Sequence, residues 1–191
     1  MEKKYHHGDL KTQLIETGLR MISEDGIQKL SLRKLAQSCG VSEAAPYSHF
    51  KNKDDLLTAM QEYITGQLQR RLEDAYEHTE PKGSTDAILN MGKAYVMFFI
   101  EYPQYNSFLF SHAMFRVDLS MKGEANDFGP FRYYKEKAFE VYRQKGMDDE
   151  RIKYGVISMW AQVYGIAAIA SLKGVKTDFE WEDELERILV G

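Results

Sequence analysis

The stretch from Ser31 to Leu57 constrains the fold of this 191-residue chain more than any other. Ser31 is typical of a helix N-cap, because its hydroxyl can accept a hydrogen bond from a free backbone N–H in the first turn. Gly40 then supplies a turn in which a residue with a Cβ would be strained. The pattern predicts a helix over residues 32–39, a tight turn and a second helix.

The second predicted helix, over residues 43–50, carries few large apolar anchors. Ser42 is its expected N-cap, and Glu43 in its first turn suits the positive end of the helix dipole. Alternatively, Ser42 acts only as a helix cap and Glu43 only as a partner of the helix dipole, without a role in DNA recognition. Pro46 falls at the fourth helical position, so at most one intrahelical hydrogen bond is lost and we expect an intact helix. A short helix with a small polar tip is typical of elements that enter a DNA major groove.

These residues resemble the DNA-binding domain of the TetR family of bacterial transcriptional regulators. The matching segments are residues 31–36, 39–42 and 47–56, which keep the family's order and spacing. The resemblance covers about residues 5–60. It implies a three-helix helix-turn-helix domain over residues 1–53, followed by a helical effector-binding and dimerisation domain over residues 54–191.

The predicted DNA contacts fall into two classes. Arg33, Tyr47 and Lys53 are expected at phosphates, whereas Ala44 and Ala45 are expected nearest the bases, because alanine methyl groups can pack on thymine methyl groups. The complete set of predicted DNA-binding residues is Ser31, Arg33, Ser42, Glu43, Ala44, Ala45, Tyr47, Ser48, His49 and Lys53.

The charge distribution agrees with a DNA-binding N-terminal part. Residues 1–53 carry a net charge of +3, although the whole chain carries −4, so residues 54–191 carry −7. A basic end attracts DNA while an acidic body is repelled, so we expect an end-on approach. The alternative is chance variation in surface charge.

The composition predicts an all-α protein. Hydrophobic residues make up 43% of the chain, only four prolines interrupt it, and alternating strand patterns are scarce. We expect about nine helices, with N-caps at Asn52, Ser84 and Asp178 and a helix starting at Asp148. The expected helices cover approximately residues 9–24, 32–39, 43–50, 53–77, 85–102, 103–112, 131–145, 148–173 and 179–190.

Fourteen Phe and Tyr residues lie between Tyr95 and Tyr142. They can simply fill a helical core, or some can line a cavity for an apolar or aromatic effector, which the resemblance favours. The predicted pocket residues are Tyr95, Phe98, Phe99, Tyr102, Phe115, Tyr134, Trp160 and Tyr164.

The stretch from Trp160 to Gly165 resembles the Trp-x-x-x-His-Gly stretch of one TetR branch, with Tyr164 in place of His. Small residues there and an apolar stripe in the last helix predict an antiparallel homodimer interface. The alternative is that both stripes pack inside one monomer. The predicted dimer residues are Ala161, Gly165, Ala168, Leu185 and Ile188.

The chain offers little to other classes of function. Its five histidines have no metal-ligand spacing, no nucleophilic triad or Gly-rich phosphate loop is evident, and so we expect no metal, no cofactor and no catalysis. Cys39 alone cannot form an intrachain disulfide, and the apolar run 156–172 is too short to span a bilayer. We therefore expect a cytoplasmic, nucleoid-associated bacterial protein without a membrane partner.

The resemblance implies a ligand-released repressor that binds an inverted-repeat operator as a dimer. Two alternatives stay open at this point. One is a DNA-binding regulator controlled by a partner protein rather than a small molecule, and the other is a helical enzyme.

Overall fold

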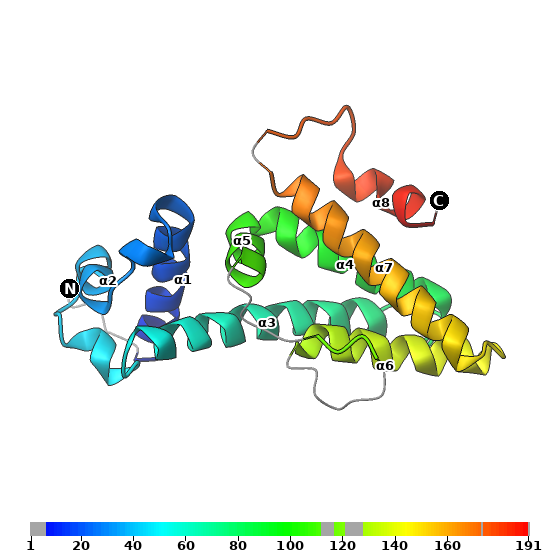
Figure 1. The fold of residues 1–191 in the computed structure, drawn as a ribbon, viewed down its shortest axis with the longest axis horizontal. Helices are drawn as coiled ribbons and strands as arrows, with labels where there is room; N and C mark the ends of the chain where they lie inside the picture. Colours follow the sequence, from blue (N-terminus) through cyan, green and yellow to red (C-terminus); the bar gives the residue numbers. More distant parts are fainter. Residues whose placement is uncertain (1–6, 112–116, 121–127, 173, 191) are drawn as a thin grey trace. The chain divides into compact units, whose positions relative to one another are not determined.

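The computed structural model describes residues 7–111, 117–120, 128–172 and 174–190, and within these ranges it contains helices and no strands (Figure 1). The all-α prediction is therefore confirmed, and eight α-helices plus two 3-10 helices are close to the expected nine. The elements are α1 (His7–Asp25), η1 (Ile27–Lys29), α2 (Leu32–Cys39), η2 (Ala45–Ser48), α3 (Lys53–Glu77), α4 (Thr85–Glu101), α5 (Pro103–Ser111), α6 (Gly129–Gln144), α7 (Asp149–Ala170) and α8 (Trp181–Val190).

Four helix starts follow from local side-chain chemistry. The side chains of Ser31, Asn52, Ser84 and Asp148 each accept a hydrogen bond from the backbone N–H three residues later, at 2.8 to 3.2 Å. Each bond satisfies one of the N–H groups that a helix leaves unpaired at its start. Gly40 ends α2 in the left-handed conformation, with φ 67°, as predicted.

The start of the last helix was predicted wrongly. α8 begins at Trp181, so Asp178 lies too early to cap it. The hydroxyl of Thr177 donates a hydrogen bond to the carbonyl of Phe179 at 2.7 Å. Such a local bond holds the backbone in a turn and competes with helix formation. The expected ends of two other helices, residues 112 and 173, lie outside the described residues.

The chain divides into two compact units. Unit one comprises Met1–Ile64 and Ser107–Met114, of which residues 7–64 and 107–111 are described. Its core contains Leu14, Leu35 and Phe50, all at most 1% exposed. At Gly18 in α1, a Cβ would come within 2.1 Å of the Met60 methyl group of α3, so the two helices pack closely there.

Unit two comprises Thr65–Asn106 and Phe115–Gly191. α4 packs against α6, α7 and α8, and is apolar around most of its circumference. The close approach of α7 and α8 to α4 occurs at Gly92, where a Cβ would lie 3.3 Å from Val163 and 3.6 Å from Leu189. α3 belongs to both units, because the division falls after Ile64. The domain boundary expected after residue 53 stays a prediction.

No helix in the described ranges has both the length and the apolar character needed to cross a membrane.

Candidate functional site

The segment between α2 and α3 is a 3-10 helix and not the α-helix predicted over residues 43–50. The backbone N–H groups of Ala45 and Tyr47 each donate to the carbonyl three residues earlier, at 2.9 and 3.1 Å. Pro46 explains this, because it has no N–H to donate to the Ser42 carbonyl and disfavours the α conformation of the residue before it. The expectation that the helix would tolerate Pro46 was wrong.

The polar side chains of this segment have different surroundings from those expected. η2 begins after Ala44 without a side-chain cap, so the cap role predicted for Ser42 is also wrong. The hydroxyl of Ser48 donates to the carbonyl of Ala45 at 2.7 Å. The side chains of Ser42, Ala44, Tyr47 and Ser48 are exposed. They therefore remain available for recognition from solvent.

Two predicted DNA contacts pair with each other. Nε of Arg33, in the first turn of α2, lies 2.8 Å from Oε1 of Glu43, just before η2. Both side chains are exposed, so water screens the pair and it contributes at most about 1 kcal/mol to stability. Its larger effect is to place a negative charge beside a cation that was expected to meet phosphate.

Lys53 and His49 are each partly enclosed by neighbours. Nζ of Lys53 donates a hydrogen bond of 2.5 Å to the carbonyl of Ile27 at the start of η1, and the stem is half-buried. The ring of half-buried His49 lies 6.1 Å from that of Phe50. Lys53 therefore stabilises the turn after α1 whether or not it also touches DNA.

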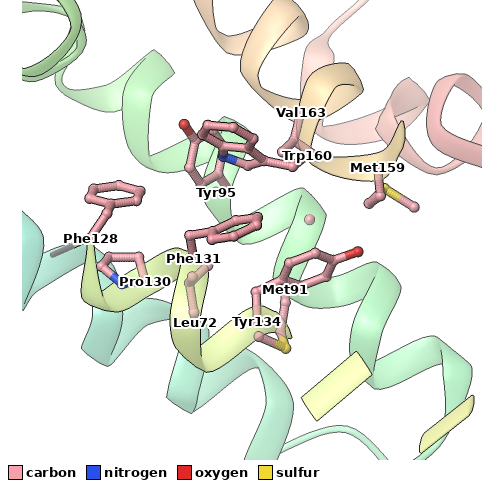
Figure 2. A pocket seen from close by; sticks show the side chains of 11 residues that line it. Leu72, Met91, Tyr95, Phe128, Pro130, Phe131, Tyr134, Met159, Trp160 and Val163 are labelled. Atoms are coloured by element: carbon pink, nitrogen blue, oxygen red, sulfur yellow. The ribbon is translucent and has the colours of Figure 1, made fainter. Parts of the chain in front are cut away.

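A small cavity lies inside unit two, among α3, α4, α6 and α7 (Figure 2). Its volume is about 20 Å³, which is enough for about one water molecule. Its described wall is almost entirely apolar or aromatic, and Phe131 packs against Trp160 with ring centres 4.9 Å apart. The lining residues are Leu72, Met91, Gly92, Tyr95, Phe128, Pro130, Phe131, Tyr134, Met159, Trp160 and Val163.

Two buried polar atoms at this wall have no hydrogen-bond partner among the described residues. They are the hydroxyl of Tyr95 and Nε1 of Trp160. Burial raises the pKa of the Tyr95 hydroxyl well above its usual range. The nearby indole N–H of Trp160 acts in the opposite direction and lowers this pKa, but its geometry does not meet that of a hydrogen bond. Burial also raises the pKa of Tyr134. Both tyrosines are therefore neutral at physiological pH.

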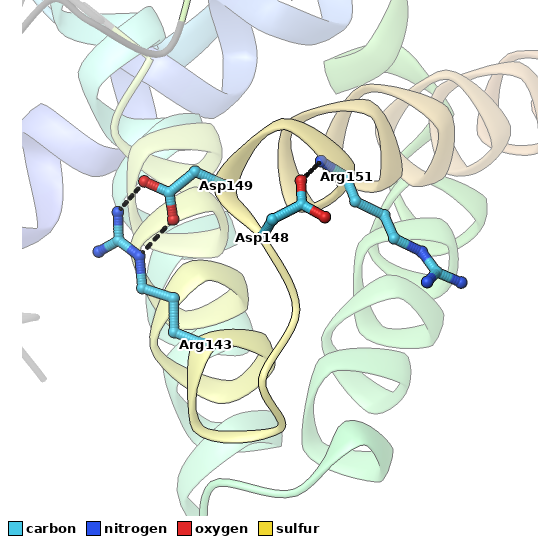
Figure 3. A network of polar contacts seen from close by, with 4 residues as sticks. All are labelled: Arg143, Asp148, Asp149 and Arg151. Atoms are coloured by element: carbon cyan, nitrogen blue, oxygen red, sulfur yellow. Dashed lines mark hydrogen bonds and ion pairs between the residues drawn. The ribbon is translucent and has the colours of Figure 1, made fainter.

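Two further hollows flank α6 and α7. A groove of about 510 Å³ shares Tyr134 and Met159 with the small cavity. A second hollow, of about 680 Å³, carries charges of both signs. It includes a two-pronged ion pair, in which Nε and Nη2 of Arg143 donate to Asp149 at 2.7 Å each and lower the pKa of that carboxyl (Figure 3).

The outer faces of α7 and α8 carry exposed apolar side chains. Leu172, just after α7, is 61% exposed, and Val190 is 68% exposed. Among the predicted dimer residues, Ala161 and Ile188 are exposed and Gly165 and Ala168 are half-buried. A Cβ at Gly165 would meet no atom within 4 Å, so nothing in the described part of this chain uses the space. Leu185, in contrast, is fully buried inside unit two.

Comparison with known proteins identifies relatives of the N-terminal segment. Residues 14–60 match the profile of the bacterial regulatory proteins of the tetR family. The chain is 31% identical over 67 residues to the HTH-type transcriptional regulator YerO of Bacillus subtilis, covering 35% of this chain and 23% of YerO. It is 35% identical over 72 residues to the nicotine-responsive repressor HdnoR of Paenarthrobacter nicotinovorans, covering 38% and 37% of the two chains.

The fold of the whole chain matches as well. The structure of AibR in complex with isovaleryl coenzyme A and operator DNA superimposes with a TM-score of 0.65 at 20% identity, covering 95% of this chain and 96% of AibR. Residues 14–60 therefore form a TetR-family helix-turn-helix segment, and the chain as a whole shares the fold of TetR-type regulators. The sequence matches to YerO and HdnoR span well under two thirds of those proteins, so they describe only the N-terminal segment of this chain.

The structure distributes the predicted TetR pocket residues over several places. Tyr95, Tyr134 and Trp160 line the cavity. Phe98 and Phe99 are at most 2% exposed and pack edge-on against each other at 5.2 Å, outside the cavity lining. The remaining three residues are Tyr102, which stacks on Tyr105 at 4.9 Å, Tyr164, which is exposed, and Phe115, which lies outside the described residues.

Several lining residues were not predicted from the sequence. Phe128 and Phe131 stand at the start of α6, and Met91 and Met159 face them from α4 and α7. The aromatic pair was counted in the cluster between Tyr95 and Tyr142, but no local pattern distinguishes a cavity wall from a core. Only the packing of helices distant in sequence decides which aromatic side chains surround a space.

Proposed function

We propose that this protein is a transcriptional regulator that binds an inverted-repeat operator as a homodimer and is released from DNA by a small, mainly apolar effector. The observation that carries the DNA-binding part is the TetR-type helix-turn-helix of unit one, with exposed polar side chains around η2. Phosphate contacts would come from Arg33, Tyr47 and Lys53. Base contacts would come from the segment between Ser42 and Ser48, with Ala44 nearest the bases.

The homodimer is supported by the outer faces of α7 and α8. Exposed apolar side chains on neighbouring helices are typical of interaction sites. Ile169 and Leu172 extend from the end of α7, and Ile188 and Val190 lie on α8. A second copy of the chain that covers these side chains of α7 and α8 would hold two DNA-binding units together, so that binding one half-site raises the local concentration of the other unit.

The effector-binding part is supported by the cavity and by the relatives. HdnoR is described as nicotine-responsive, and AibR is seen with isovaleryl coenzyme A as well as operator DNA. Release of DNA requires that the effector bind one spacing of the two DNA-binding units more tightly than the other, because equal affinity would shift nothing. α3 runs without interruption from unit one into unit two and is the covalent route for such coupling.

Selection of genomic DNA fragments by the purified full-length protein tests the proposal. We expect the selected genomic fragments to share a palindromic motif. An even number of chains should bind each copy of that motif. Recovery of fragments without a shared motif would contradict sequence-specific regulation. A thermal-shift screen with small molecules separates effector control from control by a partner protein, since a small molecule that binds the native state raises the melting temperature.

A further inference from the structure

The cavity of unit two combines an apolar wall with two polar atoms that are left unpaired. Tyr95 is 4% exposed, and neither its hydroxyl nor Nε1 of Trp160 has a partner among the described residues. An unpaired buried polar group destabilises a protein, and native structures keep few of them. Two such atoms at the wall of one cavity indicate a missing hydrogen-bond acceptor.

We propose that this cavity binds a neutral, mainly apolar molecule through one hydrogen-bond acceptor, such as a ketone or ester carbonyl oxygen. The inference rests on the proposed function and deepens it, because it names the chemical class of the effector. The Tyr95 hydroxyl and the Trp160 indole are the two groups that fix its orientation.

The acceptor character follows from the chemistry of the two side chains. The indole of Trp160 can only donate a hydrogen bond, whereas the hydroxyl of Tyr95 can donate and accept. A carbonyl oxygen has two lone pairs and can therefore accept from both groups at once. In Figure 2 the Tyr95 ring and the Trp160 indole overlap at one side of the lining residues, and the Trp160 ring centre lies 4.9 Å from that of Phe131.

The neutral character follows from the rest of the wall. No Lys, Arg, His, Asp or Glu is among the described lining residues. A buried carboxylate without a cationic partner is strongly unfavourable, and a buried cation without an anionic partner is unfavourable for the same reason. Tyr95 cannot act as the anionic partner of a cationic ligand, because burial raises the pKa of its hydroxyl and keeps it protonated and neutral.

Room for such a molecule comes from the neighbouring groove. A volume of about 20 Å³ admits no more than about one water molecule, so the cavity must widen. Met159 and Tyr134 line both the cavity and the groove of about 510 Å³. Methionine is unbranched and changes rotamer readily, so rotation of Met159 can join the two spaces. The groove is therefore the route by which the molecule enters.

The competing explanation is a single water that bridges Tyr95 and Trp160 permanently. NMR of isotope-labelled protein separates the two accounts. The chain has two tryptophans, so Trp181→Phe leaves the indole N–H of Trp160 as a single resonance. If that variant melts at a lower temperature, the wild-type protein serves instead, with the resonance assigned by Trp160→Phe.

Three probes share a phenyl ring and a short chain but differ in polarity: benzylacetone, a ketone; butylbenzene, a hydrocarbon; and phenylbutyrate, a carboxylate. We expect benzylacetone to bind and to move the Trp160 indole resonance downfield. Butylbenzene should bind about three- to tenfold more weakly, as expected for the loss of a neutral hydrogen bond. Phenylbutyrate should bind more weakly than benzylacetone by at least about tenfold.

Variants then locate the hydrogen bond. Tyr95→Phe should weaken benzylacetone binding about three- to tenfold and leave butylbenzene binding unchanged, because only the ketone uses the hydroxyl. Tyr76→Phe, at a buried tyrosine that does not line the cavity, is the matched control and should change neither.

Equal affinity for the ketone and the hydrocarbon, tighter binding of the carboxylate, or an indole resonance that benzylacetone does not move would each overturn the inference. The DNA selection described above is an independent result. Operator binding without a preference for the ketone would contradict only the effector class. A ketone preference in a protein that selects no DNA would contradict the regulatory function and leave the site intact.

Discussion

The carboxylate of Glu43 lies 2.8 Å from the guanidinium of Arg33, so two side chains that were predicted to meet DNA are joined to each other. Arg33 belongs to the first turn of α2, and Glu43 precedes η2. A phosphate must therefore compete with this carboxylate for the same cation. The pair lowers the positive potential beside the segment that is proposed to read bases.

Replacing Glu43 with glutamine should strengthen binding to random-sequence DNA. Without the carboxylate, Arg33 is available to phosphate, so the affinity at low salt should rise about three- to tenfold and the salt slope should steepen by about one. Fluorescence anisotropy titrations at several salt concentrations measure both. Asp25→Asn is the control, since it removes an acid of the same unit that pairs with Lys29 at 3.1 Å. Equal effects of the two variants would indicate only the change in net charge.

Replacing Lys53 with methionine should destabilise unit one. The change removes the hydrogen bond from the ammonium group to the Ile27 carbonyl while keeping most of the stem, and the expected loss is about 1.5 kcal/mol in the free energy of unfolding. Urea unfolding measures it. Lys51→Met, at an exposed neighbour, should leave stability unchanged. Similar stability of the two variants would mean that the bond to Ile27 contributes nothing in solution.

Replacing Gly165 with leucine tests the dimer. A side chain there meets nothing within the described chain, so the monomer should stay folded, but a closely packed partner would be displaced. Sedimentation should then show monomers, and operator affinity should fall because the half-sites are no longer bound together. Gly66→Leu, in α3 beside only the flexible end of Arg70, is the matched control. If the Gly165→Leu variant remains dimeric, the dimer interface does not include Gly165.

The stability of the protein should fall at alkaline pH, partly because of Tyr95. Burial raises the pKa of its hydroxyl, so the neutral form is favoured by folding. This contribution is complete below the unfolded value of about 10 and is lost as pH rises above it. Urea midpoints measured across that range should decline less steeply for Tyr95→Phe, and less again when Tyr134→Phe is added. An unchanged slope in the double variant would exclude both hydroxyls as the cause.

Local signals in the sequence predicted much of the secondary structure. Ser31, Ser84 and Asp148 were identifiable as helix starts because a capping hydroxyl or carboxylate acts within three residues. Gly40 was identifiable because its turn requires a positive φ. At Pro46 two local effects competed, and the missing N–H together with the restriction on Ala45 prevailed over the helix pattern.

The cavity could be predicted only in part. Tyr95, Tyr134 and Trp160 were predicted from the sequence as pocket residues, and all three line the cavity. Phe128 and Met159 were not, because their place in the wall depends on how α6 and α7 pack against α4. The Arg33–Glu43 pair joins residues ten positions apart across a turn, and no helical or strand periodicity in the sequence predicts such a contact.

The tight packing around Trp160 has a consequence for sensitivity. Because the cavity admits only about one water, a larger guest binds only a widened shape of the protein. Its apparent dissociation constant is then the intrinsic value divided by the fraction of chains in that open shape. If about one chain in a hundred is open, a guest with an intrinsic constant of about 1 μM half-saturates the protein only near 100 μM. The dose at which such a regulator responds is then tuned by the packing of Met91 and Met159. Substitutions that loosen these methionines would lower the threshold without altering any polar contact to the guest.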